Sequence, residues 1–234
     1  MPETLHRTRF LLGAAVALAL VAAAVVSFSN ERGVAANPPA LDDEIVLPSR
    51  VGAAYDRTAS ALDRSEANVD DQQYGSAAAS LSALDADLVR LHRAARAQFL
   101  APPPDPEAEA TPGPDSVLAT LGLEQWAITR LAGLYDTVAD PVIINRLSTA
   151  LNTALTRRQR MLNAVIGLDP EGAGAAYADG MADSLAGYAD EVANLTEALK
   201  VDRLTTSARD ALTNALSRSQ AAADDVNAAF GGGD

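Results

Sequence analysis

Residues 74–95 read YGSAAASLSALDADLVRLHRAA and carry the clearest structural pattern of the chain. Apolar side chains recur there at alternating spacings of three and four, at Tyr74, Ala77, Leu81, Leu84, Leu88, Leu91 and Ala95. This spacing places them on one face of an α-helix, and the arginines fall off that line. Burial of one leucine contributes about 1.5 to 3 kcal/mol, whereas a surface ion pair contributes about 0 to 1 kcal/mol, so packing should orient this helix.

A weaker apolar stripe precedes this stretch. It predicts a helix with Ser49 as its N-cap and with one face formed by Val51, Tyr55, Thr58, Leu62, Ser65 and Val69. A short turn after Asp70 should make the two helices antiparallel, so that residues 49–100 form a hairpin. The prolines of APPPDPEAEATPGP then predict a linker loop over residues 101–114.

Residues 115–230 should hold the remaining helices, the third of them beginning near residue 115. The pair Asp140-Pro141 predicts an N-cap and first helical position for the fourth helix, and Asp169-Pro170 repeats that pattern for the fifth. The sixth should begin near Leu204. The spacing leaves open whether the fifth and sixth helices are separated by a tight turn or form one kinked helix.

These patterns predict an all-α protein whose domain, residues 49–230, is an antiparallel helical bundle with coiled-coil-like seams and about six helices. Residues 231–234 should be a disordered tail. The chain contains no cysteine, which excludes a disulfide framework, a thiolate metal site and a cysteine nucleophile. The stability of the domain must therefore come from packing.

One uncharged apolar stretch, FLLGAAVALALVAAAVVSFS, spans residues 10–29. At about 1.5 Å per residue it reaches roughly 30 Å as a helix, enough to cross a bilayer. Basic side chains precede it, and such residues stay cytoplasmic, so we expect a cytoplasmic tail at 1–9 and a single-pass anchor in the cell membrane. A linker at 30–48 should lead to an extracytoplasmic domain. The alternative is a signal sequence cleaved near Ala36, which would release a secreted protein.

The composition limits the partners of this chain. Its net charge of −13 and its 4% aromatic content argue against nucleic acid, which requires clustered basic residues with stacking platforms beside them. The strong preference for Arg over Lys, with Lys200 the only lysine, is typical of a GC-rich bacterial genome. We therefore expect the membrane, through residues 10–29, and a protein of the cell envelope as partners.

Opposite charges are concentrated in the fourth and fifth predicted helices. Residues 141–168 contain four arginines and no acid, whereas residues 169–202 contain eight acids and one lysine. If the chain folds back near residue 169, ion pairs should join Arg157 and Arg158 to Asp179 and Asp183. The alternative is a Ca²⁺ or Mg²⁺ site of Asp179, Asp183, Asp190 and Glu191, but no calcium-loop pattern is present, so no metal site is assigned.

Two further groups of side chains are candidate ligand sites. Trp126, Tyr135, Tyr177 and Tyr188 could line a small-molecule cavity, although aromatic residues at helical spacing are more often core. His92 lies among Arg90, Arg93 and Arg96, which form either a solvated helix face or a site for a phosphate or carboxylate.

No catalytic residue and no cofactor are assigned. A general base at His92 would need a nucleophile and an orienting acid nearby, and no G-x-S-x-G motif occurs in the chain. Glu124, on the apolar line of the third helix, is the best hint of acid–base catalysis. We expect a non-enzymatic envelope adaptor or interaction module, with a ligand- or cation-binding sensory ectodomain as the alternative and an envelope hydrolase third.

Overall fold

The computed structural model describes residues 47–99 and 113–231, which are helical and contain no strand. Six α-helices occur in this part of the chain, so the predicted all-α class and helix number are confirmed for it. They are α2 (Ser49–Asp70), α3 (Tyr74–Phe99), α4 (Gly113–Leu134), α5 (Pro141–Ile166), α6 (Ala178–Ala198) and α7 (Thr206–Phe230). A short 3₁₀-helix, η1 (Ala175–Tyr177), leads into α6.

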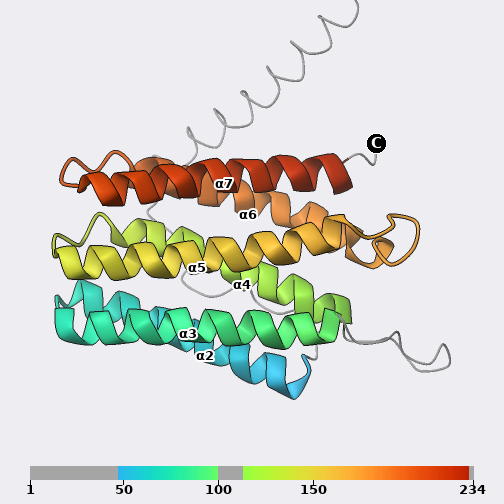
Figure 1. Cartoon of the computed structure of the whole chain (residues 1–234), viewed down its shortest axis with the longest axis horizontal. Coiled ribbons are helices and arrows are strands. Elements are labelled where there is room, and N and C mark those ends of the chain that lie inside the picture. Colours follow the sequence, from blue (N-terminus) through green and yellow to red (C-terminus); the bar gives the residue numbers. More distant parts are fainter. Residues whose placement is uncertain (1–46, 100–112, 232–234) are drawn as a thin grey trace, which may run out of the picture. The chain divides into compact units, whose positions relative to one another are not determined.

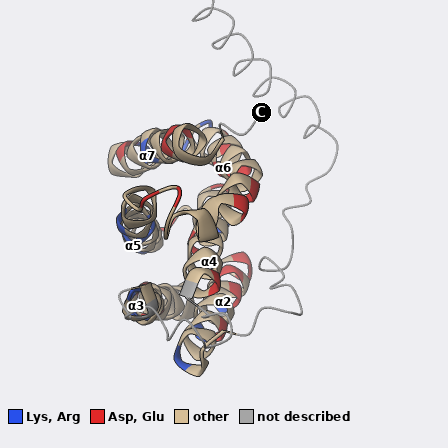
Figure 2. Cartoon of the chain, turned by 90° about the vertical axis from the view of Figure 1, so that its right-hand side faces the viewer, with Lys and Arg blue, Asp and Glu red and all other residues tan. Residues whose placement is uncertain are grey.

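The bundle is a stack of three helical hairpins, α2–α3, α4–α5 and α6–α7 (Figure 1). Viewed from the side, α3, α5 and α7 form one layer, and α2, α4 and α6 form the other (Figure 2). Neighbouring helices pack within each layer, and each hairpin joins the two layers. Stacked hairpins also build the α-solenoids, in which every repeat packs mainly on its neighbours.

The predicted apolar seams form the core. In α3 every seam residue from Ala77 to Ala95 is buried, and Tyr74 packs partly buried against the same cluster. The stripe of α2 is buried as well, including Thr58 and Ser65, whose hydroxyls donate back to carbonyl groups of their own helix, those of Ala54 and Ala61. Because these hydroxyls are satisfied locally, they can lie in the core without a partner on another helix.

The α4–α5 turn confirms the predicted cap. The Asp140 side chain accepts hydrogen bonds from the backbone N–H groups of Val142 and Ile143, at 2.8 and 3.1 Å, and Pro141 occupies the first helical position. This carboxylate satisfies two of the backbone donors that a helix N-terminus leaves unpaired.

Replacing Asp140 with alanine should lower the free energy of unfolding by about 0.5 to 2 kcal/mol, because both donors lose their acceptor. Chemical denaturation followed by circular dichroism measures this change. The matched control is Asp136→Ala, which removes an exposed carboxylate of the same turn and should change stability by less than about 0.5 kcal/mol. Equal losses in the two variants would contradict the capping role.

The second predicted Asp-Pro helix start is wrong. Asp169 and Pro170 lie in a turn, and α6 begins only at Ala178. The backbone N–H groups of Gly172 and Gly174 both donate to the Asp169 carbonyl, at 3.1 and 2.8 Å, so the chain curls around that oxygen. A Cβ atom at Gly174 would lie 2.8 Å from the same oxygen, so this turn depends on a glycine, which the Asp-Pro pattern alone does not reveal.

The connection between α6 and α7 is a tight turn and not a kink. Its last residue, Thr205, accepts a hydrogen bond from the backbone N–H of Ala208 and so caps α7. The Arg209 guanidinium donates to the carbonyl groups of Leu199 and Val201, which lie past the end of α6. The turn thus ends in an N-cap for α7, and the carbonyl groups that follow α6 accept hydrogen bonds from the Arg209 cation.

The predicted membrane anchor, residues 10–29, lies outside the described residues, as do the tail at 1–9 and residues 101–112 of the predicted loop 101–114. The last two residues of that loop, Gly113 and Pro114, belong instead to the first turn of α4. Among the helices of residues 47–99 and 113–231, none combines the length and the apolar character needed to span a bilayer.

Candidate functional site

A buried ion pair joins α5 and α6 inside the core. Arg158 of α5 is 1% exposed and Glu191 of α6 is 0% exposed. The guanidinium donates two hydrogen bonds to the carboxylate, one from Nη2 to Oε1 at 2.9 Å and one from Nη1 to Oε2. The guanidinium carbon also lies 4.8 Å from the centroid of the Tyr188 ring, at cation–π distance. The long arginine side chain thus bridges two helices that lie diagonally across the stack.

Each charge of this pair stabilises the ionised form of the other. Burial alone would lower the pKa of Arg158, but the Glu191 carboxylate more than offsets it, and the pKa is raised. Burial raises the pKa of the neighbouring Tyr188 hydroxyl to about 12, so this group stays neutral. A bidentate pair enclosed in this way specifies geometry, because either charge left alone would be costly.

A second buried pair, His92 of α3 and Glu124 of α4, lies close by. The His92 Nδ1 atom is 3.8 Å from the Glu124 Oε1 atom, which is too long for a hydrogen bond. Neither carboxylate oxygen of Glu124 has a hydrogen-bond partner within the described residues. Burial raises the pKa of Glu124 well above its usual range, although the charges of Arg158 and Arg157 partly oppose this. A neutral, protonated carboxyl group is therefore the stable form inside the fold.

His92 is neutral for a related reason. Burial, together with the charges of Arg157, Arg96 and Arg160, lowers the pKa of its imidazole to about 4. The three arginines have no acidic partner in the described part of the chain. Since the unfolded imidazole titrates near pH 6.5, protonation of His92 should cost stability as the pH falls from 6.5 toward 4.

Glu124 predicts a pH dependence of the opposite sign. Its folded pKa lies above its unfolded value of 4.5, so its contribution is fully present below that value and is lost as the pH rises through the folded pKa. Glutamine keeps the shape but cannot ionise. Glu124→Gln should match the parent chain near pH 4.5 and then gain up to about 1.4 kcal/mol of relative stability per pH unit until the folded pKa is reached.

Urea denaturation at pH values between about 4.5 and 9 tests this pH dependence. The control is Glu171→Gln, which alters an exposed carboxylate and should follow the parent chain at every pH. Parallel curves for the Glu124→Gln variant and the parent chain would show that Glu124 is ionised in the folded protein.

The predicted cross-helix ion pairs have a different arrangement. Arg158 pairs with Glu191, and none of the ion pairs in the described residues joins Arg157 or Arg158 to Asp179 or Asp183. Both aspartates are exposed on α6. No group of three or more histidine, aspartate or glutamate side chains in the described segments is arranged to hold a metal ion.

The four aromatic residues are divided between two core clusters. Trp126 and Tyr135 belong to one core cluster, and Tyr177 and Tyr188 belong to the other. The Trp126 ring lies under the Arg130 guanidinium, 4.3 Å from its carbon atom, and Arg130 pairs with two acids of α2, Asp63 and Glu66.

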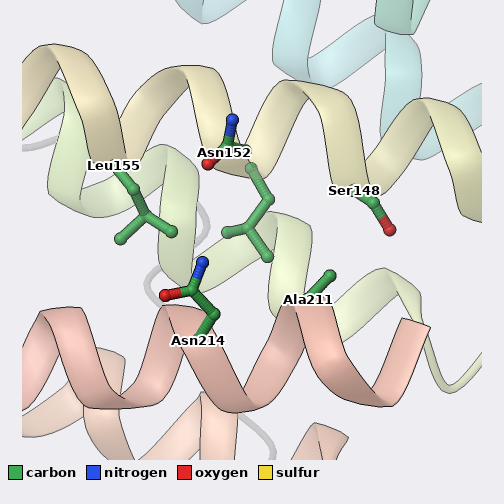
Figure 3. Close-up of a pocket in the computed structure, with 6 residues that line it drawn as sticks. Ser148, Asn152, Leu155, Ala211 and Asn214 are labelled. Carbon is green, nitrogen blue, oxygen red and sulfur yellow. The ribbon is translucent and has the colours of Figure 1, made fainter. Parts of the chain in front are cut away.

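Two of the hollows on the described surface bear on these predictions. One, of about 170 Å³, lies between α5 and α7 and is lined by the side chains of Figure 3, which include Ser148, Asn152 and Asn214. The other, which we call the α4–α6 groove, has a volume of about 330 Å³. Only the second is lined by any of the four aromatic residues, namely Tyr188.

The α4–α6 groove was not predicted from the sequence. Ten residues line it: Leu118, Leu121, Gly122, Gln125, Gly180, Met181, Asp183, Ser184, Gly187 and Tyr188. The usable signal was the spacing of Gly180 and Gly187, seven residues apart on one side of α6, because glycines at heptad spacing allow a neighbouring helix to approach closely.

Comparisons of the chain with protein-family models, with curated proteins and with solved structures found no match. The fold and the site thus define the class in general terms. The described residues form stacked helical hairpins, with the buried Arg158–Glu191 ion pair in the core and an open groove on one face.

Proposed function

We propose that this protein is a non-enzymatic, membrane-anchored interaction module of the bacterial cell envelope, whose helical domain binds partner proteins outside the cytoplasm. The apolar stretch at residues 10–29 would be the anchor. The observation that carries the proposal is the separation of charge between the two helical layers.

The two layers have opposite net charge. With Glu124 neutral, helices α2, α4 and α6 carry −1, 0 and −5, a net charge of −6 for their layer. Helices α3, α5 and α7 carry +1, +4 and −1 with histidine neutral, a net charge of +4. Figure 2 shows acidic segments on α6 and α2, and also on α7 of the other layer. Complementary charge between partners raises association rates and selects among them, so two faces of opposite sign support binding of different partners.

The burial of the acid–base groups also supports a binding role over hydrolysis. Glu124 and Glu191 are 0% exposed, and His92 is 5% exposed. A general acid or base must reach the proton that it transfers, directly or through one water molecule. In the described structure these groups lie inside the packed helices, where they set how the hairpins fit together.

Photocrosslinking in intact cells tests the proposal. An unnatural photoreactive residue would replace Ala186 on α6, Ala83 on α3 or Thr149 on α5, all of which are exposed. The expected result is a discrete protein adduct from at least one layer, together with cleavage of the C-terminus by protease added outside the cytoplasmic membrane. Protection of the C-terminus, or the absence of adducts from every exposed position on both layers, would contradict it. In the latter case the ligand-sensing alternative would take its place.

A further inference from the structure

We infer that the α4–α6 groove, with the outer face of α6 beside it, is the docking site for a basic amphipathic helix of a partner protein. This inference rests on the proposed function and names the chemistry of one partner. Four features of the described residues carry it: the apolar walls of the groove, its free polar groups, the heptad spacing on α6 and the charge of that helix.

The groove has apolar walls because α4 and α6 approach closely. A Cβ atom at Gly180 would lie 2.6 Å from a methyl carbon of Leu118, and a Cβ atom at Gly187 would lie 2.6 Å from the Gln125 Oε1 atom. These glycines let side chains of α4 rest directly on the backbone of α6. Leu118, Leu121 and Met181 then line a hollow open enough to receive the side chains of a second protein.

Two polar side chains of the groove, Gln125 and Tyr188, are buried, and each has one hydrogen-bonding group without a partner in the described residues. Gln125 is 8% exposed, and its Nε2 atom donates to the Ser184 carbonyl at 3.3 Å, while its Oε1 atom accepts no hydrogen bond within the described residues. Tyr188 is 2% exposed, and its hydroxyl likewise forms no hydrogen bond there. With Asp183 at the edge, the groove offers acceptors for a cationic or amide donor.

Helix α6 has two seams on opposite sides. Its buried seam includes Met181, Tyr188 and Leu195, spaced by seven. Its outer face has the same alternating spacing of three and four residues, but with acids and alanines in place of large apolar side chains. These residues are Asp179, Asp183, Ala186, Asp190, Ala193 and Glu197. The alanines leave room for a second helix to approach, and the acids would pair with basic side chains of that helix at matching heptad positions.

The charges on this face argue against two acidic segments of the chain and against pairing of α6 with its own copy. Of the four acids in the outer seam, only Glu197 has an ion-pair partner in the described structure, Lys200. Two segments outside the described residues, 37–46 and 100–112, adjoin the described helices in the sequence. Both contain acids and neither lysine nor arginine. Either segment would be repelled by α6, as would α6 of a second copy, so a basic partner fits best.

The experiment measures binding of a synthetic peptide to the full chain in nonionic detergent. The peptide spans three heptads, with arginine and leucine along one helical face. Two controls are a scrambled peptide of the same composition and a peptide with glutamate in place of arginine. Fluorescence anisotropy should show binding of the patterned peptide at least tenfold tighter than that of either control. Equal binding of the patterned and scrambled peptides would overturn the inference.

Charge reversal locates the site. Asp183→Lys combined with Asp190→Lys should weaken binding of the patterned peptide at least tenfold. Asp224→Lys combined with Asp225→Lys makes the same change in net charge on an exposed part of α7 and should alter binding by less than twofold. Thermal denaturation of both variants shows whether they fold. Equal weakening by folded variants of both kinds would mean that overall charge alone drives binding and would overturn the inference.

Two outcomes separate this inference from the proposed function. Sedimentation of the full chain would reveal self-association, and its loss in the Asp183/Asp190 variant would mean that a second copy occupies the face. If the patterned peptide fails to bind while crosslinks persist from α3 or α5 in cells, the docking site is wrong but the interaction module stands. If crosslinking also fails from every exposed position on both layers, the proposed function is wrong as well.

Discussion

Replacing Arg158 with methionine should lower the free energy of unfolding by about 3 to 5 kcal/mol, one of the two largest effects that we expect from a single substitution. The change leaves the Glu191 carboxylate buried without its cation, and burial of an unpaired charge costs far more than the loss of a surface ion pair. Urea denaturation of the full chain in nonionic detergent, followed by circular dichroism, measures the loss.

The double variant Arg158→Met with Glu191→Leu tests this reason. It removes both charges and replaces them with apolar side chains, so it should recover most of the stability lost by Arg158→Met alone. The surface control is Lys200→Met, which breaks an exposed pair with Glu197 and should cost less than about 1 kcal/mol. A loss for Arg158→Met as small as that of the control would mean that water reaches the Arg158–Glu191 pair.

Replacing Leu88 with alanine should cost about 2 to 5 kcal/mol. Leu88 is 0% exposed in the seam of α3, so its truncation removes apolar contacts and leaves a cavity that the surrounding helices fill only in part. Thermal and urea denaturation measure the effect.

The matched control for Leu88→Ala is an exposed apolar side chain. Val142 is 60% exposed near the start of α5, and Val142→Ala should change stability by less than about 0.5 kcal/mol. If Leu88→Ala were as mild as this control, α3 would not be held by its leucine seam, and the packing of α2 and α5 on that helix would need another explanation.

The positions of the helices could be predicted because apolar spacing reports burial directly. The seam of α3 and the cap at Asp140 depend on residues close together in sequence, so local rules apply to them. The start of α6 could not be predicted from the Asp-Pro pattern, because a carbonyl-centred turn with two glycines competes with helix formation there.

The buried Arg158–Glu191 ion pair was harder to predict from the sequence. Pairing of Arg158 with Glu191 depends on the diagonal distance between helices, which spacing along one helix does not determine. A usable signal was present: Glu191 lies three residues after Tyr188 and four before Leu195, inside the buried seam of α6, where an acid must find a partner. The predicted aspartates Asp179 and Asp183 lie instead on the exposed side of that helix.

The two layers exist only if the hairpins form an open stack. The proposed binding faces therefore depend on this arrangement. It places α5 between α3 and α7, whereas a closed bundle would bring α7 back against α3. The chain contains no cysteine, so pairs of introduced cysteines can be labelled cleanly. Suitable exposed positions are Ala83 on α3, Thr149 on α5 and Thr213 on α7.

Dipolar electron paramagnetic resonance between spin labels at these positions is the most direct test. Packed helices lie about 8 to 10 Å apart, so the α3–α7 separation should be about twice the α3–α5 separation. A ratio near two is the expected result. Equal α3–α5 and α3–α7 separations would contradict the two-layer stack and the opposed charged faces built on it.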